Sequence, residues 1–357
     1  MCASGPFYEE FAGRYYGELN EVPFIANRMC DDYGLDTNVV WVIIDWLARC
    51  RQTGLLSGKQ TDLALSKLGS LEFIETLLQQ ITFQEGFGAI LAEGPLRAAQ
   101  TLGPGAEDLL GDHIARDGSE AYYLPRIYIA NALLFALEPR QPYSMTSEIG
   151  GTVLRWLGTK KPQIGSDDVR YIAEQFWGSG FAADFTTYRD KALAAKMVQD
   201  RLSVKDSAIF CHFTWHPGAI ERFRPEIVSE ILSAVTGLRY DKSSFYRLGE
   251  RIANMQRAAV VRDRGCGRAG DALPEFCFMT PVKDDFLNPD LLVPDSDLQP
   301  VTRKDSVLDR QQFESMKNEY YRLRGWDVDS GLQKASTLGE LGLADVALEL
   351  RKANLVC

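Results

Sequence analysis

Two short acidic segments carry the residues best suited to chemistry. In the first, residues 31–37 (DDYGLDT), carboxylates surround a glycine directly before an apolar stretch. As local structure, this pattern predicts a turn in which Gly34 takes a positive φ and Asp36 or Thr37 caps the following helix. Carboxylates on a turn also accept hydrogen bonds from the ring and amino N–H groups of a heterocycle. The spacing alone leaves both interpretations open.

In the second segment, residues 206–212 (DSAIFCH), a thiol and an imidazole stand side by side after an acid. A buried structural cysteine is the commonest role of such a free thiol. A nucleophilic pair of Cys211 and His212 is disfavoured because adjacent side chains on a helix or strand point in different directions. As a metal ligand, Cys211 needs partners from elsewhere in the fold. His212 and His216 could share a helical face for a metal, but Pro217 disfavours a helix there.

The elements that must position these residues are mainly helices, because apolar residues recur at helical spacing and strand-like alternation is scarce. Residues 263–308, rich in Gly, Pro and Asp, predict a functional or packing loop. Ser336 and Thr337 are candidate N-caps of the last helix. The predicted helices cover about 38–51, 70–83, 88–102, 126–138, 167–177, 182–202, 227–235, 248–259, 310–324 and 338–353. We therefore predict a mainly α fold with two helical domains, 1–150 and 151–357, divided within a Pro- and Gly-containing stretch at 139–165.

Composition excludes several classes of protein. The 357 residues are 45% hydrophobic and 25% charged, which is typical of a globular chain long enough for two domains. A net charge of -10 provides no basic surface for nucleic acid. The longest apolar run, residues 39–44, is too short to span a bilayer, and the first ten residues lack the pattern of a secretory signal. The seven cysteines are scattered and contain no C-x-x-C, which is typical of reduced thiols and not of a disulfide framework. Together with the missing secretory signal and the short apolar run, this predicts a cytoplasmic protein without a membrane span.

Taken in order, these segments resemble the tungsten-containing aldehyde ferredoxin oxidoreductase family, specifically its second and third domains. Residues 5–9 (GPFYE) are similar to the family's G-P-E-Y-E, and residues 31–36 fit D-x-x-G-L-D in full. Residues 206–211 are similar to D-x-x-G-L-C, although Ile209 and Phe210 stand where Gly and Leu are usual. Further likeness at 90–94, 176–179, 270–274 and 320–327 extends the match over nearly the whole chain.

The resemblance implies a tungsten or molybdenum ion held by the dithiolenes of two pterins, beside a [4Fe–4S] cluster. Asp31 and Asp206 would each hydrogen-bond a pterin, Asp36 would assist, and Cys211 would be the fourth cluster ligand. Glu9 is the expected proton-handling catalytic residue. The implied reaction oxidises an aldehyde to a carboxylate and passes electrons to ferredoxin or to an iron–sulfur electron-transfer subunit.

The chain departs from the family at its N-terminal side. Family members carry a β-rich N-terminal domain that cradles the pterins, followed by a C-x-x-C-x-x-x-C segment that supplies three cluster ligands. This sequence has neither, since Cys2 lies too close to the GPFYE segment and Cys30 and Cys50 lack compact spacing. We therefore expect the three remaining ligands to lie outside this chain. Either the N-terminal part is a separate polypeptide, or this chain is a fragment of a longer one, or the protein has lost the chemistry.

A second departure concerns a histidine that family members use near the metal and that we expect within 139–150. No histidine stands there, and Tyr143 or Glu148 could substitute. The residues of a bridging iron site are also missing before Asp31, so we expect no mononuclear iron. Two alternatives stay open: a fragment of a catalytic subunit like that of class II benzoyl-coenzyme A reductases, and a non-catalytic helical remnant that acts as a scaffold.

Overall fold

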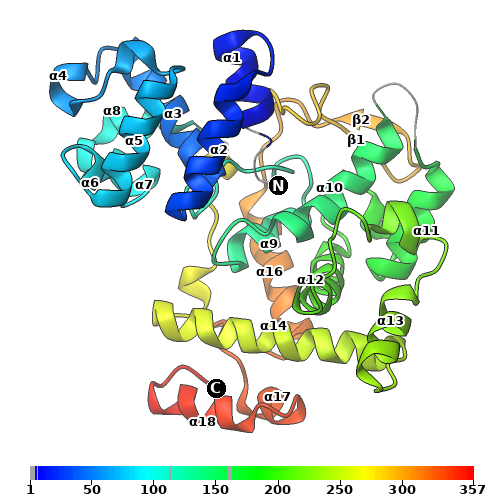
Figure 1. Cartoon of the computed structure of the whole chain (residues 1–357). Helices are drawn as coiled ribbons and strands as arrows, with labels where there is room; N and C mark the ends of the chain where they lie inside the picture. Colours follow the sequence, from blue (N-terminus) through cyan, green and yellow to red (C-terminus); the bar gives the residue numbers. More distant parts are fainter. Residues whose placement is uncertain (1–4, 6, 112–113, 159–162) are drawn as a thin grey trace. The chain divides into compact units, whose positions relative to one another are not determined.

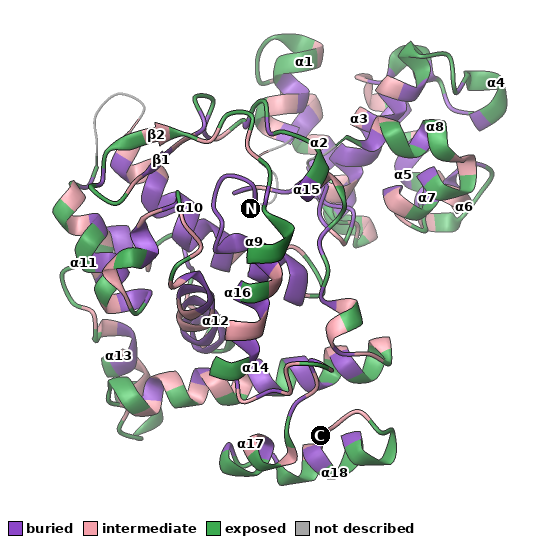
Figure 2. Ribbon diagram, turned by 180° about the vertical axis from the view of Figure 1, so that it is seen from behind, coloured by how far each residue is buried: buried purple, intermediate pink, exposed green. Residues whose placement is uncertain are grey.

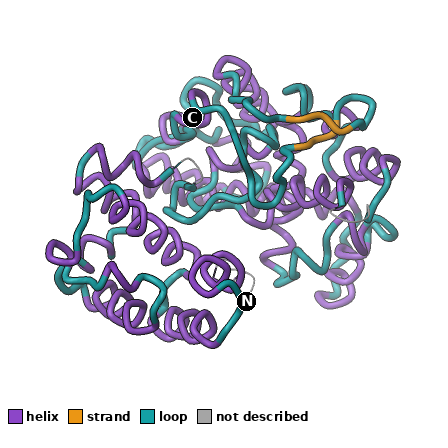
Figure 3. The backbone as a smooth tube through the Cα atoms, turned by 90° about the horizontal axis from the view of Figure 1, so that it is seen from above, coloured by secondary structure: helices purple, strands orange, loops and turns teal. Residues whose placement is uncertain are grey.

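The computed structural model describes residues 5, 7–111, 114–158 and 163–357, and it confirms the predicted mainly α fold (Figure 1). Within these residues the only paired strands are β1 (Leu292–Pro294) and β2 (Pro300–Thr302), which form an antiparallel ladder. Helices joined by loops make up the rest (Figure 3). None of the described helices combines the length and the apolar character that crossing a membrane requires.

The backbone contacts divide the chain into two compact units, Met1–Ala121 and Tyr122–Cys357. The first unit contains its own apolar core, whose buried members all lie between Phe7 and Ile114. Helix α10 (Tyr143–Leu157) belongs to the second unit and contains residue 150. The boundary between the two units therefore lies at residues 121–122, away from the domain boundary that the sequence predicts. The domains 1–150 and 151–357 stay a prediction.

In the first unit, α3 is the helix buried most completely, because apolar side chains occupy most of its turns (Figure 2). A short π-helix, η2 (Phe7–Phe11), buries Phe7 and Phe11 in the same core. The helices are α1 (Ala12–Tyr16), α2 (Glu21–Tyr33), α3 (Thr37–Gln52), α4 (Gly58–Thr61), α5 (Leu71–Phe83), α6 (Gly88–Leu91), α7 (Pro95–Leu102) and α8 (Pro104–Glu107).

In the second unit, α12 (Lys191–Ser207) contacts α9, α10, α11, α14 and α16, and most of its residues are buried. A Cβ at Gly249 would lie 2.0 Å from the Asp200 carbonyl oxygen, so only glycine allows α14 to approach α12 so closely. The other helices are α9 (Asn131–Leu137), α10 (Tyr143–Leu157), α11 (Ser166–Phe176), α13 (Ile227–Thr236), α14 (Lys242–Arg264), α15 (Phe276–Met279), α16 (Arg310–Leu323), α17 (Ala335–Glu340) and α18 (Ala344–Lys352).

Several predicted helix limits need correction. The helix predicted over 88–102 is two helices, because Gly94 takes a φ of 88° and Pro95 starts α7. The helix predicted over 338–353 is also divided, and Ser336 and Thr337 lie inside α17, whose N-cap is Lys334. In contrast, α3, α5 and α16 match their predicted ranges within one residue at each end.

Candidate functional site

The acidic turn at 31–36 has the local structure predicted for it. Gly34 ends α2 with a φ of 71°. The Asp36 side chain accepts hydrogen bonds from the backbone N–H of Asn38 at 2.8 Å and of Val39 at 3.4 Å, so it caps α3. Asp31, at the end of α2, is exposed and accepts a 3.3 Å bond from the Asn27 amide. The turn thus presents one capping carboxylate, that of Asp36, and two further exposed carboxylates, those of Asp31 and Asp32.

Residues 7–9 of the GPFYE segment lie within η2, where two adjacent glutamates have different surroundings. Glu9 is exposed. Glu10 is partly buried, and desolvation together with the nearby carboxylate of Glu120 raises its pKa to about 7. Arg14 and a hydrogen bond from the Trp41 ring oppose that rise. A carboxyl group with a pKa near 7 can carry a proton at neutral pH, so Glu10 is a proton-handling candidate that the sequence pattern did not reveal.

The second motif lies at the end of α12 and in the loop that follows it. Asp206 is exposed near the last turn of α12, and desolvation raises its pKa. Cys211 is exposed in the loop. Hydrogen bonds from the Thr214 N–H and hydroxyl and from the Phe213 N–H lower the pKa of Cys211, because they stabilise the thiolate. Cys211 therefore differs from the buried structural cysteine that is the commonest role of a free thiol, and its role as a cluster ligand stays a prediction.

The remaining described cysteines do not complete a ligand set. Burial raises the pKa of Cys30 to about 12 and that of Cys50 to about 11, which disfavours the thiolate that a metal requires. Throughout the part of the chain that the structure describes, no three His, Cys, Asp or Glu side chains are placed to hold a metal ion. Cys2 lies outside the described residues. Cys211 is thus an exposed thiol without a described group of three metal-binding side chains around it.

A buried group of four charged side chains, here called the charge cluster, joins α10, α12 and the π-helix η6 (Pro217–Glu221). It consists of Glu148, Arg201, Lys205 and Glu221. Arg201 pairs with both carboxylates, and Lys205 Nζ lies 3.0 Å from Glu221 Oε1. Two cations balance two anions, which is how charges can be buried at this depth. Glu148, one of the two proposed substitutes for the family's histidine, is fully buried in this cluster.

Two histidines lie next to the charge cluster in the Cys211 loop. The rings of His212 and His216 are 5.0 Å apart, and burial lowers the pKa of both, which keeps them neutral. His216 Nδ1 accepts a 2.9 Å bond from the Gly218 N–H, and its Nε2 lies 3.3 Å from the Ser147 carbonyl oxygen. Both ring nitrogens of His212 are buried without a hydrogen-bond partner. The two histidines lie in a loop and not on one helix face, as Pro217 led us to expect.

Tyr143, the other proposed substitute, is half-buried at the start of α10. Its ring centroid lies 5.7 Å from that of Phe213, which belongs to the Cys211 loop. The candidate site residues are thus divided between the two units. The second unit contains Tyr143, Glu148, Asp206 and Cys211, and the first contains Glu9, Asp31 and Asp36.

Sequence reasoning missed the charge cluster, although its signal is present. Arg201 and Lys205 are spaced i, i+4 in a helix that is otherwise rich in Ala, Val and Leu, and charged residues on an apolar helix face need buried partners. Their partners Glu148 and Glu221 lie far away in the sequence. Nothing in one sequence links such distant positions, so the pairing became visible only with the fold.

Comparisons with known proteins show the family to which the chain belongs. Residues 19–343 match the family described as "Aldehyde ferredoxin oxidoreductase, domains 2 & 3". The tungsten-containing aldehyde ferredoxin oxidoreductases of Pyrococcus furiosus and Pyrococcus abyssi are 25% and 26% identical to the chain, over 351 and 353 residues. Each match covers 96% of this chain and 49% of the relative, so the chain spans about half the length of these curated relatives.

A solved structure shows the same fold. It is the active-site complex BamBC of benzoyl coenzyme A reductase with 1,5-dienoyl-CoA, which superposes with a TM-score of 0.60 at 17% identity. The superposition covers 99% of this chain and 50% of that one. At this identity the likeness establishes the fold alone.

Proposed function

This chain belongs to the family of aldehyde ferredoxin oxidoreductase domains 2 and 3, and from that premise we propose that it forms part of a tungsten enzyme that oxidises aldehydes. The family match and the relatives, which are named oxidoreductases, support the general class. The observation that carries the proposal is the exposed Cys211 thiol with its lowered pKa, at the cysteine position of the second family motif.

Cys211 fits the role of a cluster ligand by its chemistry. The thiolate is the form that binds iron, and the hydrogen bonds from Thr214 and Phe213 favour it. Because no three His, Cys, Asp or Glu side chains of the described residues are grouped to hold a metal ion, the other three ligands of a [4Fe–4S] cluster would come from outside the described residues. Such a cluster supplies single-electron transfer, which would lead electrons to ferredoxin or to an iron–sulfur subunit.

Asp31 and Asp206 fit the role of pterin-binding residues, since both carboxylates are exposed and can accept hydrogen bonds from ring N–H groups. Asp36 has a narrower role. Its Oδ1 atom is engaged in capping α3, so it would assist only through its second oxygen. Bound through two pterins, a tungsten or molybdenum ion would supply the two-electron redox chemistry.

Oxidising an aldehyde to a carboxylate takes one oxygen from water, removes two electrons and releases protons. The chain's own contribution is therefore to move protons and to position groups. Glu9 is exposed and can exchange protons with solvent, whereas Glu10, with a pKa of about 7, can hold or release a proton at neutral pH. We assign proton handling to this pair of glutamates.

The test compares two exposed cysteines in this chain coexpressed with the polypeptide that carries the pterin-cradling domain. Cys211→Ala should abolish the cluster's visible absorption and lower the iron content of the purified complex by about four atoms. Cys357→Ala is the matched control, because that thiol is equally exposed and lies outside the motif. Equal iron content in the two variants would contradict the proposal.

A further inference from the structure

One buried lysine is bonded to the chain on both sides of Cys211. Lys205 lies in the last turn of α12, and its carbonyl oxygen accepts a 2.9 Å hydrogen bond from the N–H of Phe210. The Lys205 ammonium donates a hydrogen bond to the carbonyl oxygen of Trp215. Phe210 and Trp215 directly border residues 211–214, so Lys205 holds both ends of the loop that contains the exposed thiol.

The two residues that border the loop also contact each other. The ring centroids of Phe210 and Trp215 are 5.4 Å apart and the rings are nearly perpendicular, which is a favourable edge-to-face arrangement. Both rings pack against a small apolar cluster that contains Val204 and Phe245. The Trp215 N–H donates a 3.0 Å hydrogen bond to the carbonyl oxygen of Cys211. Residues 211–214 therefore form a short loop that is closed at its base.

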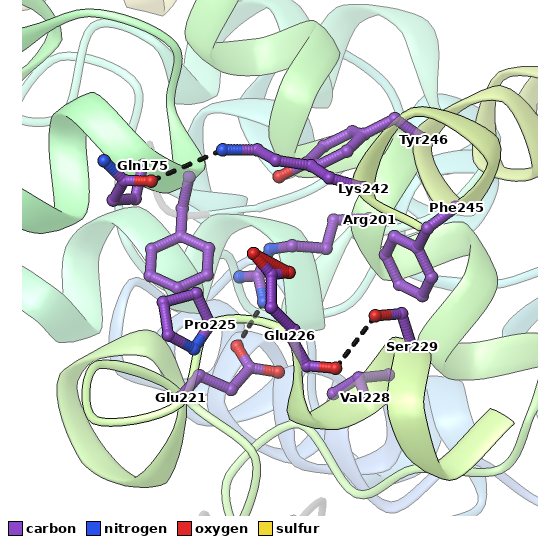
Figure 4. Close-up of a pocket in the computed structure, with 11 residues that line it drawn as sticks. Gln175, Arg201, Glu221, Pro225, Glu226, Val228, Ser229, Lys242, Phe245 and Tyr246 are labelled. Atoms are coloured by element: carbon purple, nitrogen blue, oxygen red, sulfur yellow. Dashed lines mark hydrogen bonds and ion pairs between the residues drawn. The ribbon is translucent and has the colours of Figure 1, made fainter. Parts of the chain in front are cut away.

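The group that anchors this loop is charged although it is fully buried. Burial lowers the pKa of Lys205 to about 8, so the ammonium keeps its charge at pH 7. Its charge is balanced within the charge cluster, where Glu221 pairs with Lys205 and also with Arg201, as Figure 4 shows for the second pair. Buried ion pairs seldom stabilise a fold more than packed apolar side chains do. Stability alone therefore gives little reason for a charge at this position.

The Lys205 charge also acts on the Cys211 sulfur. Hydrogen bonds from Thr214 and Phe213 lower the pKa of the Cys211 thiol most, and the Lys205 ammonium lowers it further. A cation that stabilises a thiolate also stabilises the reduced form of an iron–sulfur cluster bound to that thiolate, because the reduced form carries one more negative charge. The reduction potential of such a cluster depends on the charges and hydrogen bonds around it.

We propose that Lys205 is a positioning residue for Cys211, which fixes the loop at residues 210–215 and raises the reduction potential of the [4Fe–4S] cluster through its charge. This inference rests on the function proposed above, in which Cys211 is the cluster ligand that this chain supplies. Lys205 does not bind iron and acts only through the loop and through its charge. A higher potential makes the cluster a better acceptor of the electrons that the oxidation releases.

The experiment is a redox titration at pH 7 of the complex of this chain with the polypeptide that carries the pterin-cradling domain, followed by electron paramagnetic resonance. Lys205→Met removes the charge and keeps an apolar side chain of similar length. At a fixed solution potential, the ratio of reduced to oxidised cluster should fall about tenfold, a shift of about 59 mV for one electron. Glu221→Gln removes a negative charge from the same charge cluster, so the ratio should rise. A purely structural role would not produce shifts of opposite sign.

Lys191→Met is the matched control. Lys191 is also a fully buried lysine of α12, but its ammonium bonds to the carbonyl oxygens of Phe181 and Arg189 at the other end of the helix. The potential should be the same in this variant as in the parent. A shift in Lys191→Met as large as that in Lys205→Met, or an unchanged potential in Lys205→Met, would overturn the inference.

Hydrogen exchange on the full chain alone tests the anchor without the cluster. The amides of residues 210–215 should exchange faster in Lys205→Met than in the parent and in Lys191→Met, because the loop loses the bond to Trp215. Equal exchange in all three proteins would overturn the positioning role. If Lys205→Met does not assemble a complex, the absence of a rise in Glu221→Gln overturns the role of the charge. A parent complex without iron would instead contradict the proposed function, and with it the effect on the potential.

Discussion

Ile209 adopts a backbone conformation that β-branched residues rarely take. It follows the C-cap of α12 with a φ of 61°, and its N–H bonds to the Asp206 carbonyl oxygen at 3.1 Å. In this left-handed region an L side chain with a branched Cβ costs about 1–2 kcal/mol. The family's second motif has glycine at this position. The chain therefore keeps the bend that leads to Cys211 while it replaces the residue best suited to form it.

We expect Ile209→Gly to raise the free energy of unfolding by about 0.5–1 kcal/mol, because relief of strain exceeds the added entropy of the unfolded chain. Little packing is lost, since 92% of the Ile209 side chain is exposed. Urea unfolding followed by circular dichroism measures the change. Val235→Gly is the control: Val235 is 80% exposed but helical, so glycine should destabilise there. If Ile209→Gly and Val235→Gly both lowered the free energy of unfolding, the claim that the backbone at Ile209 is strained would be wrong.

The raised pKa of Glu10 makes the stability of the protein depend on pH. The folded protein holds a proton on Glu10 up to about pH 7, whereas the unfolded chain releases it near 4.5. Between these values the folded state binds more protons than the unfolded state, so stability falls as the pH rises from about 4.5 to 7. After allowance for solvent screening of a partly buried group, we expect about 1–2 kcal/mol across this range.

Glu10→Gln should remove this loss, because the amide keeps the neutral form at every pH. The variant should equal the parent near pH 4.5 and exceed its stability above pH 7, as measured by thermal melts over a pH series. Glu9→Gln is the control, since an exposed substitution changes stability by less than about 0.5 kcal/mol. A parent and a Glu10→Gln variant with parallel pH profiles would refute the argument.

At the scale of elements, the Asp36 cap decides where α3 begins. The helix is almost wholly buried, and its first free N–H groups need an acceptor, which Asp36 supplies. Asp36→Ala should lower the free energy of unfolding by about 1 kcal/mol. Asp36→Asn keeps a capping oxygen, so its free energy of unfolding should stay close to that of the parent protein. Asp32→Ala, which removes only an exposed pair with Arg28, is the control for chemical denaturation. A loss from Asp36→Asn as large as that from Asp36→Ala would show that the charge and not the cap matters.

The elements also show what a single sequence can and cannot reveal. The turn at Gly34 and the cap at Asp36 were predictable because both depend on residues a few positions apart. The start of α12 at Lys191 was not, because Asp190 stands before it with a φ of 57° that its residue type does not signal strongly. The charge cluster depends on contacts between residues 53 and 20 positions apart. Such pairing is a property of the packed fold.

At the scale of the whole molecule, each of the two units contains buried side chains packed against helices of the same unit. The buried core of the first unit ends at Ile114, before the unit's last residue, Ala121. In the second unit every residue of α9 is buried, and α10 contacts α9, α11 and α12. Division at residue 150, as the sequence suggests, would separate α9 and part of α10 from helices that cover their apolar faces.

Two fragments of the chain, residues 1–121 and residues 1–150, test whether the domain boundary lies at residue 121 or at residue 150. Residues 1–121 should unfold cooperatively by circular dichroism, because their core is complete, and they should bind little of a hydrophobic dye. Residues 1–150 should bind the dye strongly, because Leu133, Leu134 and Ile149, all buried in the full chain, would lose their cover. The reverse result, with a cooperative 1–150 fragment and a poorly folded 1–121 fragment, would support the domain limits predicted from the sequence.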